Sequence, residues 1–222
     1  MTTRAVLLDA LGTLVELEDP APRLKEQLCF YGISVSDRQA EAAFAAEIAY
    51  YLAHHLEGRD EASVEDLRDR CAEHLRRALD VPALSPATAR RAMVRALWFE
   101  PYDDVVPALR RLRELGLKLV IVSNWDASLP EWLHPLGLTD LVDATVTSAE
   151  VGAAKPDPRV FQRALEVADV DAGEAVHVGD SLDNDVQGAR AAGIRPLLVA
   201  RQGEPPPGVE AVRSLAEVAS VI

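Results

Sequence analysis

The sequence has few cysteines, few lysines, no excess of positive charge and no long hydrophobic run. Its two cysteines, Cys29 and Cys71, lie outside any Cys-x-x-Cys spacing, so we expect ordinary thiols in a reducing cytosol. No apolar stretch is long enough to span a bilayer. The apolar run at the N-terminus is interrupted by Asp9 and lacks a small-residue cleavage pattern, which argues against a signal peptide. The sequence therefore predicts a cytoplasmic protein.

The charge balance is acidic. The 222 residues include 36 Asp and Glu against 23 Lys and Arg, a formal net charge of −13. Nucleic acids and anionic membrane surfaces bind clustered positive charge, so neither is expected as a partner. A small anionic substrate is not excluded, because it responds to the local field at its site and not to the total charge. The oligomeric state has no signal in the sequence.

Apolar runs alternate with helical patterns over most of the chain. Residues 4–9, 117–122, 144–147, 175–178 and 196–199 have the composition of buried strands. Strands that alternate with helices indicate a parallel sheet covered on both faces. We therefore predict an α/β fold with a Rossmann-like parallel sheet.

The segment between the first and second of these strands is helical, and no convincing strand occurs in it. Ser36 with Gln39 resembles a capping box, Ser63 opens another helix, and Ser85 before Pro86 is a favourable helix start. The predicted domains are an α/β core, residues 1–15 and 100–222, and an inserted all-helical domain, residues 16–99.

Polar clusters follow four of the predicted strands. The carboxyl ends of parallel strands meet at one edge of the sheet, where open α/β sheets bind their ligands. Four clusters at such ends can therefore build one site. The clusters are Asp9 with Gly12 and Thr13; Ser123 with Asn124; Lys155 within Ala-Ala-Lys-Pro-Asp-Pro; and His-Val-Gly-Asp-Ser-Leu-Asp-Asn-Asp, residues 177–185.

The residue types in these clusters suit phosphoryl transfer. A carboxylate can attack phosphorus and form an aspartyl phosphate. Asp9 and Asp180, from different strands, can share Mg²⁺, which favours oxygen ligands and lets an anionic nucleophile approach an anionic phosphate. Ser123 and the backbone amide of Asn124 can bind phosphate oxygens, and Lys155 supplies fixed positive charge.

Taken in order, the motifs Asp-x-x-Gly-Thr-Leu, Ser-Asn, Lys-Pro-Asp-Pro and Gly-Asp-Ser-x-x-x-Asp resemble those of the haloacid dehalogenase-like hydrolase superfamily. The chain is similar to the subgroup with a helical cap inserted after the first motif, and the resemblance covers nearly all of it. The resemblance implies a Mg²⁺-dependent hydrolase that acts on a small phosphorylated metabolite through an aspartyl-phosphate intermediate. Specificity is then expected from insert side chains that meet the edge of the core.

The resemblance also implies a role for each matching residue. Asp9 would be the nucleophile and a metal ligand, Ser123 the phosphate-binding hydroxyl, and Lys155 the charge-stabilising lysine. Asp180 would be the second metal ligand, and Asp185 an acid that supports the metal waters or the lysine. The expected substrate-binding residues are Gly12, Thr13 and Asn124.

Leu11 departs from the family pattern. Phosphatases of the family usually have an aspartate at this position, which protonates the leaving group and then activates water. Leucine can do neither, so we expect slower turnover, by a factor of about 10²–10⁴. The family's metal contact here is the backbone carbonyl, which Leu11 retains. The loss should matter least for good leaving groups such as acyl or aryl phosphates.

Two other functions remain open. In a 2-haloacid dehalogenase the same aspartate attacks carbon, but such enzymes often have a tyrosine in place of Leu11 and lack the metal-binding aspartate that Asp180 supplies. The second alternative is a catalytically weak homologue that binds a phosphometabolite or a protein partner, and only Leu11 supports it.

Five further residues have less specific interpretations. His177 is expected to be a core histidine whose hydrogen bonds are satisfied. Trp125 and Asp126 either face the substrate or pack under the helical insert. His54 and His55 lack the i, i+4 spacing of a helical metal site and are expected at the insert surface or near the substrate.

Overall fold

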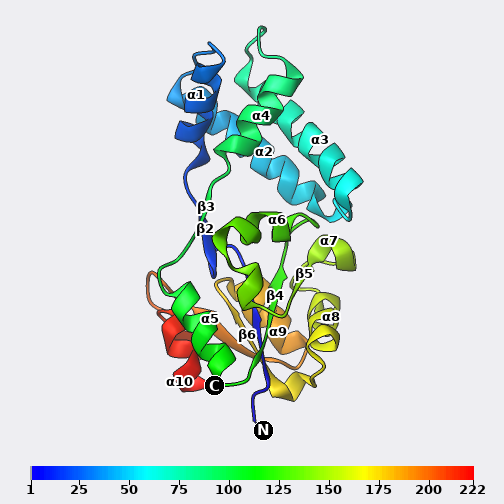
Figure 1. The fold of residues 1–222 in the computed structure, drawn as a ribbon, viewed down its shortest axis with the longest axis vertical. Coiled ribbons are helices and arrows are strands. Elements are labelled where there is room, and N and C mark those ends of the chain that lie inside the picture. Colours follow the sequence, from blue (N-terminus) through cyan, green and yellow to red (C-terminus); the bar gives the residue numbers. More distant parts are fainter. Residues whose placement is uncertain (1) are drawn as a thin grey trace. The chain divides into compact units, whose positions relative to one another are not determined.

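The computed structural model describes residues 2–222, which form two compact units (Figure 1). One unit contains the residues up to Glu16 together with Pro101–Ile222, and the other is Leu17–Glu100. Each boundary lies one residue further along the chain than the sequence-based boundary. We describe the two units separately, as an α/β unit and a helical unit.

The α/β unit contains a six-stranded parallel sheet in the order β5-β4-β1-β6-β7-β8. The predicted fold class is confirmed. β1 lies in the middle, between β4 and β6, so its carboxyl end is the point where the strand order changes direction. The strands are β1 (Ala5–Leu8), β4 (Lys118–Ser123), β5 (Ala144–Thr147), β6 (Ala175–Gly179), β7 (Arg195–Val199) and β8 (Ala211–Val212).

Helices cover both faces of this sheet, as the continuous apolar strands require. All four residues of β1 are buried. Leu7 and Val122 pack on one side against Phe161 in a single hydrophobic cluster. In Figure 1, α5 and α10 lie on one face and α8 and α9 on the other. These helices are α5 (Val105–Glu114), α8 (Pro158–Ala168), α9 (Gly188–Ala191) and α10 (Val218–Val221).

Short helices lie near the carboxyl edge of the sheet: α6 (Leu129–Leu133), α7 (Ser148–Val151) and the π-helix η5 (Leu182–Gln187). The sequence predicts one helix over 183–192, whereas the structure has η5 followed by α9. The wide turn arises because Val186 N–H donates to the carbonyl of Ser181, five residues earlier, at 3.1 Å.

The helical unit contains α1 (Pro20–Phe30), α2 (Asp37–His54), α3 (Glu61–Leu79) and α4 (Pro86–Ala96) around its own apolar core. The capping box of Ser36 and Gln39 and the N-cap at Ser85 are confirmed. The predicted start of α3 at Ser63 is wrong by two residues, because the Asp60 carboxylate caps this helix and accepts a hydrogen bond from Ser63 N–H at 2.9 Å.

Two three-residue strands, β2 (Val15–Leu17) and β3 (Phe99–Pro101), pair with each other where the chain passes between the units. They lie at the boundaries of a segment in which the sequence pattern shows no strand, because three residues are too few to establish a period of two.

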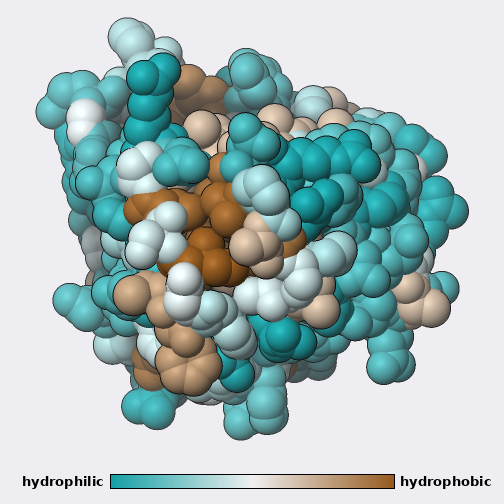
Figure 2. Space-filling model, turned by 90° about the horizontal axis from the view of Figure 1, so that it is seen from above, coloured by the Kyte–Doolittle hydropathy of each residue, from teal (hydrophilic) through white to brown (hydrophobic). Residues whose placement is uncertain are grey.

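The face shown in Figure 2 is mostly hydrophilic, in keeping with the net charge of −13, and hydrophobic residues gather near its centre. Some large apolar side chains of the helical unit are exposed, among them Phe30 at 78% and Leu52 at 63%. Within residues 2–222, none of the helices has both the length and the apolar character needed to cross a membrane.

Candidate active site

Asp9 directly follows β1, and its side chain is buried at the carboxyl edge of the sheet. The chain then turns sharply, because the backbone N–H groups of residues 13–15 all donate to the carbonyl of Ala10. Gly12 has φ +86°, and a Cβ at this position would lie 2.1 Å from Asp180 Oδ2. The loop therefore requires glycine for two reasons, the positive φ and the close approach of Asp180.

Lys155 lies between two carboxylates. Its Nζ donates to Asp9 Oδ1 at 2.5 Å and to Asp185 Oδ1 at 2.6 Å, and its side chain is only 2% exposed. A buried charge is strongly unfavourable unless it is paired and hydrogen-bonded, so the three groups depend on one another. The structure thus brings together residues from three of the four predicted clusters. Lys155 does not directly follow its strand as expected, since α7 comes between β5 and the lysine.

Asp9, Asp185 and Lys155 differ in how strongly their surroundings favour the charged form. Burial raises the pKa of Asp9 to about 6, and the nearby Lys155 opposes this only in part. Burial would also raise the pKa of Asp185, but Lys155 and a hydrogen bond from His177 hold it well below its usual range. Burial would lower the pKa of Lys155, but the charges of the two carboxylates raise it. Lys155 is therefore a fixed cation and Asp185 a fixed anion, whereas the charge of Asp9 depends on what binds beside it.

A third carboxylate, Asp180, completes an acidic cluster. Oxygen atoms of Asp9, Asp180 and Asp185 all lie within 4.8 Å of one another. Both oxygens of Asp185 already accept hydrogen bonds, from Lys155, His177 and a backbone N–H. Asp180 as a whole residue is exposed, but partial loss of solvent around its carboxylate and the charge of Asp185 raise the pKa of this carboxyl group. This donor set fits a hard cation such as Mg²⁺, which Asp9 and Asp180 can hold directly while Asp185 fixes the lysine.

Ser123 and Asn124 lie at the end of β4, the strand next to β1. The Ser123 side chain is buried, and its Oγ donates to Asp9 Oδ1 at 3.4 Å. Asn124 uses its side chain on the backbone of Lys155: it accepts from the Lys155 N–H at 2.6 Å and donates to the Lys155 carbonyl at 3.0 Å. Asn124 therefore fixes the loop that carries the lysine. A contact between its backbone amide and phosphate stays a prediction.

His177 belongs to the same network. It is fully buried in β6, and its Nε2 lies 2.9 Å from Asp185 Oδ1. Its Nδ1 has no hydrogen-bond partner among residues 2–222, so the expected core histidine is satisfied at one nitrogen only. The sequence contained one usable signal, a polar residue in an otherwise apolar strand three positions before Asp180.

The other residues of uncertain role have local contacts. Trp125 is 8% exposed, and the buried Asp126 accepts hydrogen bonds from the backbone N–H and the hydroxyl of Ser128. In the helical unit, the His54 ring stacks on Tyr50 with the ring centroids 4.0 Å apart. His55 is buried, and its Nδ1 lies 3.1 Å from a backbone carbonyl.

Arg201 lies just past β7 and has no counterpart among the sequence predictions. Its Nη2 donates to the carbonyl of Thr13 at 2.7 Å, and its Nη1 lies 3.1 Å from Asp104 Oδ2. The guanidinium also lies 3.7 Å from the centre of the Tyr102 ring. Arg201 thus ties the C-terminal part of the chain to the loop that follows Asp9. No local pattern could reveal a contact between residues 188 positions apart.

Two predicted site residues, Leu11 and Thr13, belong to the loop that follows Asp9. Thr13 is fully buried, and its Oγ1 has no hydrogen-bond partner among the described residues. The Leu11 side chain is 43% exposed and supplies neither a proton donor nor an acceptor.

Comparisons with known proteins agree with this arrangement. A protein named haloacid dehalogenase-like hydrolase domain-containing protein 3, from Bos taurus, is 46% identical over 92 residues, which cover 41% of this chain and 37% of the relative. A glyceraldehyde 3-phosphate phosphatase from Methanopyrus kandleri is 39% identical over 106 residues, which cover 47% of this chain and 45% of the relative. The chain thus matches less than half the length of either relative.

The fold is similar to the crystal structure of a HAD phosphatase from Thermococcus onnurineus, with a TM-score of 0.66 and 28% identity over 99% of this chain and 97% of that chain. The family model for haloacid dehalogenase-like hydrolases matches residues 3–193. That range includes the whole of the network around Asp9 and Lys155, so this chain belongs to the haloacid dehalogenase-like hydrolases.

Proposed function

We propose that this protein is a Mg²⁺-dependent phosphatase of a small phosphorylated metabolite, with Asp9 as its nucleophile. The observation that carries the proposal is the buried contact of Asp9 with Lys155, beside the exposed carboxylate of Asp180. A carboxylate in contact with a fixed cation suits attack on a phosphate dianion, which it would otherwise repel. Two relatives are named for phosphatase activity, on glyceraldehyde 3-phosphate and on ribulose 1,5-bisphosphate, which supports the same reaction class.

In the proposed reaction, an oxygen of Asp9 bonds to phosphorus while the bond from phosphorus to the leaving oxygen breaks. Lys155 and Ser123, which both contact Asp9, stabilise the negative charge of the transferring group. Mg²⁺ held by Asp9, Asp180 and the Leu11 carbonyl would neutralise further charge on the phosphate. Water then attacks phosphorus, so that inorganic phosphate leaves and the Asp9 carboxylate is restored.

Proton transfer is the weak step of this proposal. The leaving oxygen must take its proton from solvent, because Leu11 has none to give. Water must attack the phosphorylated Asp9 without a base at the same position. Acyl phosphates need little help in the first step because their leaving groups are stable anions. We therefore expect hydrolysis of acetyl phosphate to exceed that of alkyl phosphates, and breakdown of the phosphorylated enzyme to be slow.

The test is hydrolysis of acetyl phosphate and p-nitrophenyl phosphate with Mg²⁺ and with a chelator. We expect turnover that depends on Mg²⁺ and is abolished by Asp9→Asn. Asp183→Asn is the matched control, because it alters an exposed aspartate of the same motif outside the acidic cluster. Chloride release from 2-chloropropionate without Mg²⁺ would overturn the proposal in favour of a dehalogenase. No turnover of either class would favour a binding homologue.

A further inference from the structure

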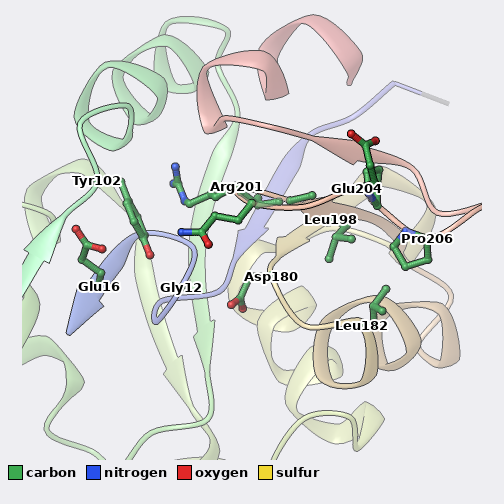
Figure 3. A pocket seen from close by; sticks show the side chains of 13 residues that line it. Gly12, Glu16, Tyr102, Asp180, Leu182, Leu198, Arg201, Glu204 and Pro206 are labelled. Carbon is green, nitrogen blue, oxygen red and sulfur yellow. The ribbon is translucent and has the colours of Figure 1, made fainter. Parts of the chain in front are cut away.

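A pocket of about 360 Å³ lies in the α/β unit beside Asp180. Asp180 lies between a polar end, next to the Asp9 loop, and an apolar end (Figure 3). The polar end includes Glu16 and Tyr102, and the largely apolar end includes Leu182, Leu198 and Pro206, with Glu204 beside them. None of these side chains has a role in the reaction proposed above.

The polar side chains of the pocket have hydrogen-bonding capacity that the protein leaves unused. Within residues 2–222, the Glu16 carboxylate, the Tyr102 hydroxyl and the Gln202 amide make no hydrogen bond or ion pair. Arg201 also lines the pocket, and its buried Nε has no partner among the described residues although both its Nη groups are engaged. Glu16 and Gln202 are exposed and Tyr102 is half-buried, so a ligand in the pocket can reach all three. A concave pocket on which a few polar groups converge is a typical ligand site.

The charges in the pocket disfavour a second anionic group. Arg201 is neutralised by Asp104, 3.1 Å away, and Glu204 is paired with Arg213 at 2.9 Å. Among the described residues, Glu16 has no partner in an ion pair. Burial and the nearby Glu16 raise the pKa of the Tyr102 hydroxyl, which therefore remains a donor. Ligand hydroxyl groups both donate and accept hydrogen bonds, so they can pair with the carboxylate, the phenol and the amide of the pocket. A phosphate or carboxylate group on the ligand only accepts hydrogen bonds, and it would be repelled by the Glu16 carboxylate.

We propose that this pocket binds the uncharged, hydroxyl-bearing part of a phosphate monoester whose phosphate lies at Asp9. The inference rests on the phosphatase function proposed above. Side chains of the α/β unit then contribute to substrate specificity. The sequence predicts specificity only from side chains of the helical insert. Glu16 accepts hydrogen bonds from substrate hydroxyls, and Tyr102 donates to one of them.

The test uses two phosphates of equal chain length, erythritol 4-phosphate and butyl phosphate. Both are alkyl phosphates and should turn over slowly, so each is measured as a competitive inhibitor of acetyl phosphate hydrolysis by the Mg²⁺-loaded protein. We expect erythritol 4-phosphate to inhibit at least about tenfold more tightly, the ratio that corresponds to about one hydrogen bond to a charged group. A third compound, butane-1,4-diol bisphosphate, should bind no more tightly than butyl phosphate.

Glu16→Gln and Tyr102→Phe should each reduce the preference for erythritol 4-phosphate, by about tenfold and about threefold respectively. The preference is the ratio of the inhibition constants of butyl phosphate and erythritol 4-phosphate, both measured on the same variant. A general loss of activity affects both constants equally and so does not change the ratio. Glu166→Gln and Tyr31→Phe alter residues of the same types that do not line the pocket, and they should leave the ratio unchanged.

An unchanged ratio in both pocket variants would overturn the inference while leaving the phosphatase proposal intact. Equal inhibition by the two compounds, or tightest inhibition by the bisphosphate, would do the same. Absence of any acetyl phosphate hydrolysis by the unaltered protein would instead defeat the proposed function, and the inference with it.

Discussion

Gly12 and Asp180 approach each other so closely that a Cβ on Gly12 would lie 2.1 Å from Asp180 Oδ2. The contact joins the loop after β1 to the end of β6, and it places the Asp180 carboxylate against the backbone next to Leu11. The affinity for a metal ion held between these two loops would depend on the close approach of Gly12 and Asp180. Metal affinity can be measured without any substrate.

Gly12→Ala should displace Asp180 and so weaken the stabilisation of the fold by Mg²⁺, measured as the shift in thermal unfolding temperature on adding the ion. Gly137→Ala is the matched control, because Gly137 also has positive φ, +69°, but a Cβ there meets nothing within 4 Å. Backbone strain of about 1–2 kcal/mol is common to both variants. Equal Mg²⁺ shifts in the two variants would show that the contact has no part in metal binding.

Lys155→Met should lower the free energy of unfolding by about 3–5 kcal/mol, because it leaves the carboxylates of Asp9 and Asp185 buried without a counter-charge. Denaturation by urea in the absence of Mg²⁺ measures the loss. Lys118→Met is the control: this lysine is 58% exposed, 3.7 Å from Asp143, and should contribute at most about 1 kcal/mol. Similar small losses in the two variants would contradict the central role of Lys155.

Glu47 should make the stability of the protein depend on pH. It lies in α2 with 5% of its side chain exposed, and burial raises its pKa to about 7 although a hydrogen bond from Cys71 opposes this. Between pH 4.5 and 7 the folded state holds a proton that the unfolded state has lost, so the free energy of unfolding falls as pH rises through this interval.

Glu47→Gln should remove this part of the pH dependence, on the order of 2 kcal/mol between pH 5 and pH 8 in urea denaturation. Other titrating groups contribute equally to both proteins and cancel in the difference. Glu41→Gln, an exposed change in the same helix, should leave the pH dependence unaltered. If Glu47→Gln behaves in the same way as Glu41→Gln, the raised pKa is refuted.

Leu11→Asp should increase the turnover of alkyl phosphates by up to about 10²-fold, because it supplies both a proton donor for the leaving group and a base for the second step. Acetyl phosphate needs only the base, so its turnover should rise less. Steady-state phosphate release with Mg²⁺ measures both rates. Leu115→Asp places the same acid at another exposed leucine of the α/β unit and should have no effect. A folded, Mg²⁺-binding Leu11→Asp protein with no gain would refute our explanation of the missing acid.

The sequence predicts most of the α/β unit because its strands are continuous apolar runs. The predicted bounds of β5 match the structure. The failures concern short elements and long-range contacts. The strands β2 and β3 are too short to show a period, and the π-turn of η5 depends on a hydrogen bond across five residues that no periodicity encodes.

In the candidate site, too, some features can be predicted from the sequence and others depend on long-range contacts. The order of the motifs identifies the residues that meet around Lys155, since parallel strands bring their carboxyl ends together. The second partner of Asp185, His177, and the side-chain role of Asn124 emerge only in three dimensions. The role of Arg201 could not be predicted from the sequence, because Arg201 contacts Thr13 and Tyr102, which are distant along the chain. The sheet brings these segments together.

The central claim is that Asp9 accepts the phosphoryl group. Because Leu11 provides no base for the second step, the phosphorylated protein should accumulate when Mg²⁺ and acetyl phosphate are added. Acid quenching followed by intact-protein and peptide mass spectrometry measures it directly. We predict one added phosphoryl group per chain, located at Asp9 and absent from Asp9→Asn. An unmodified Asp9 during turnover, with undiminished turnover by Asp9→Asn, would contradict it.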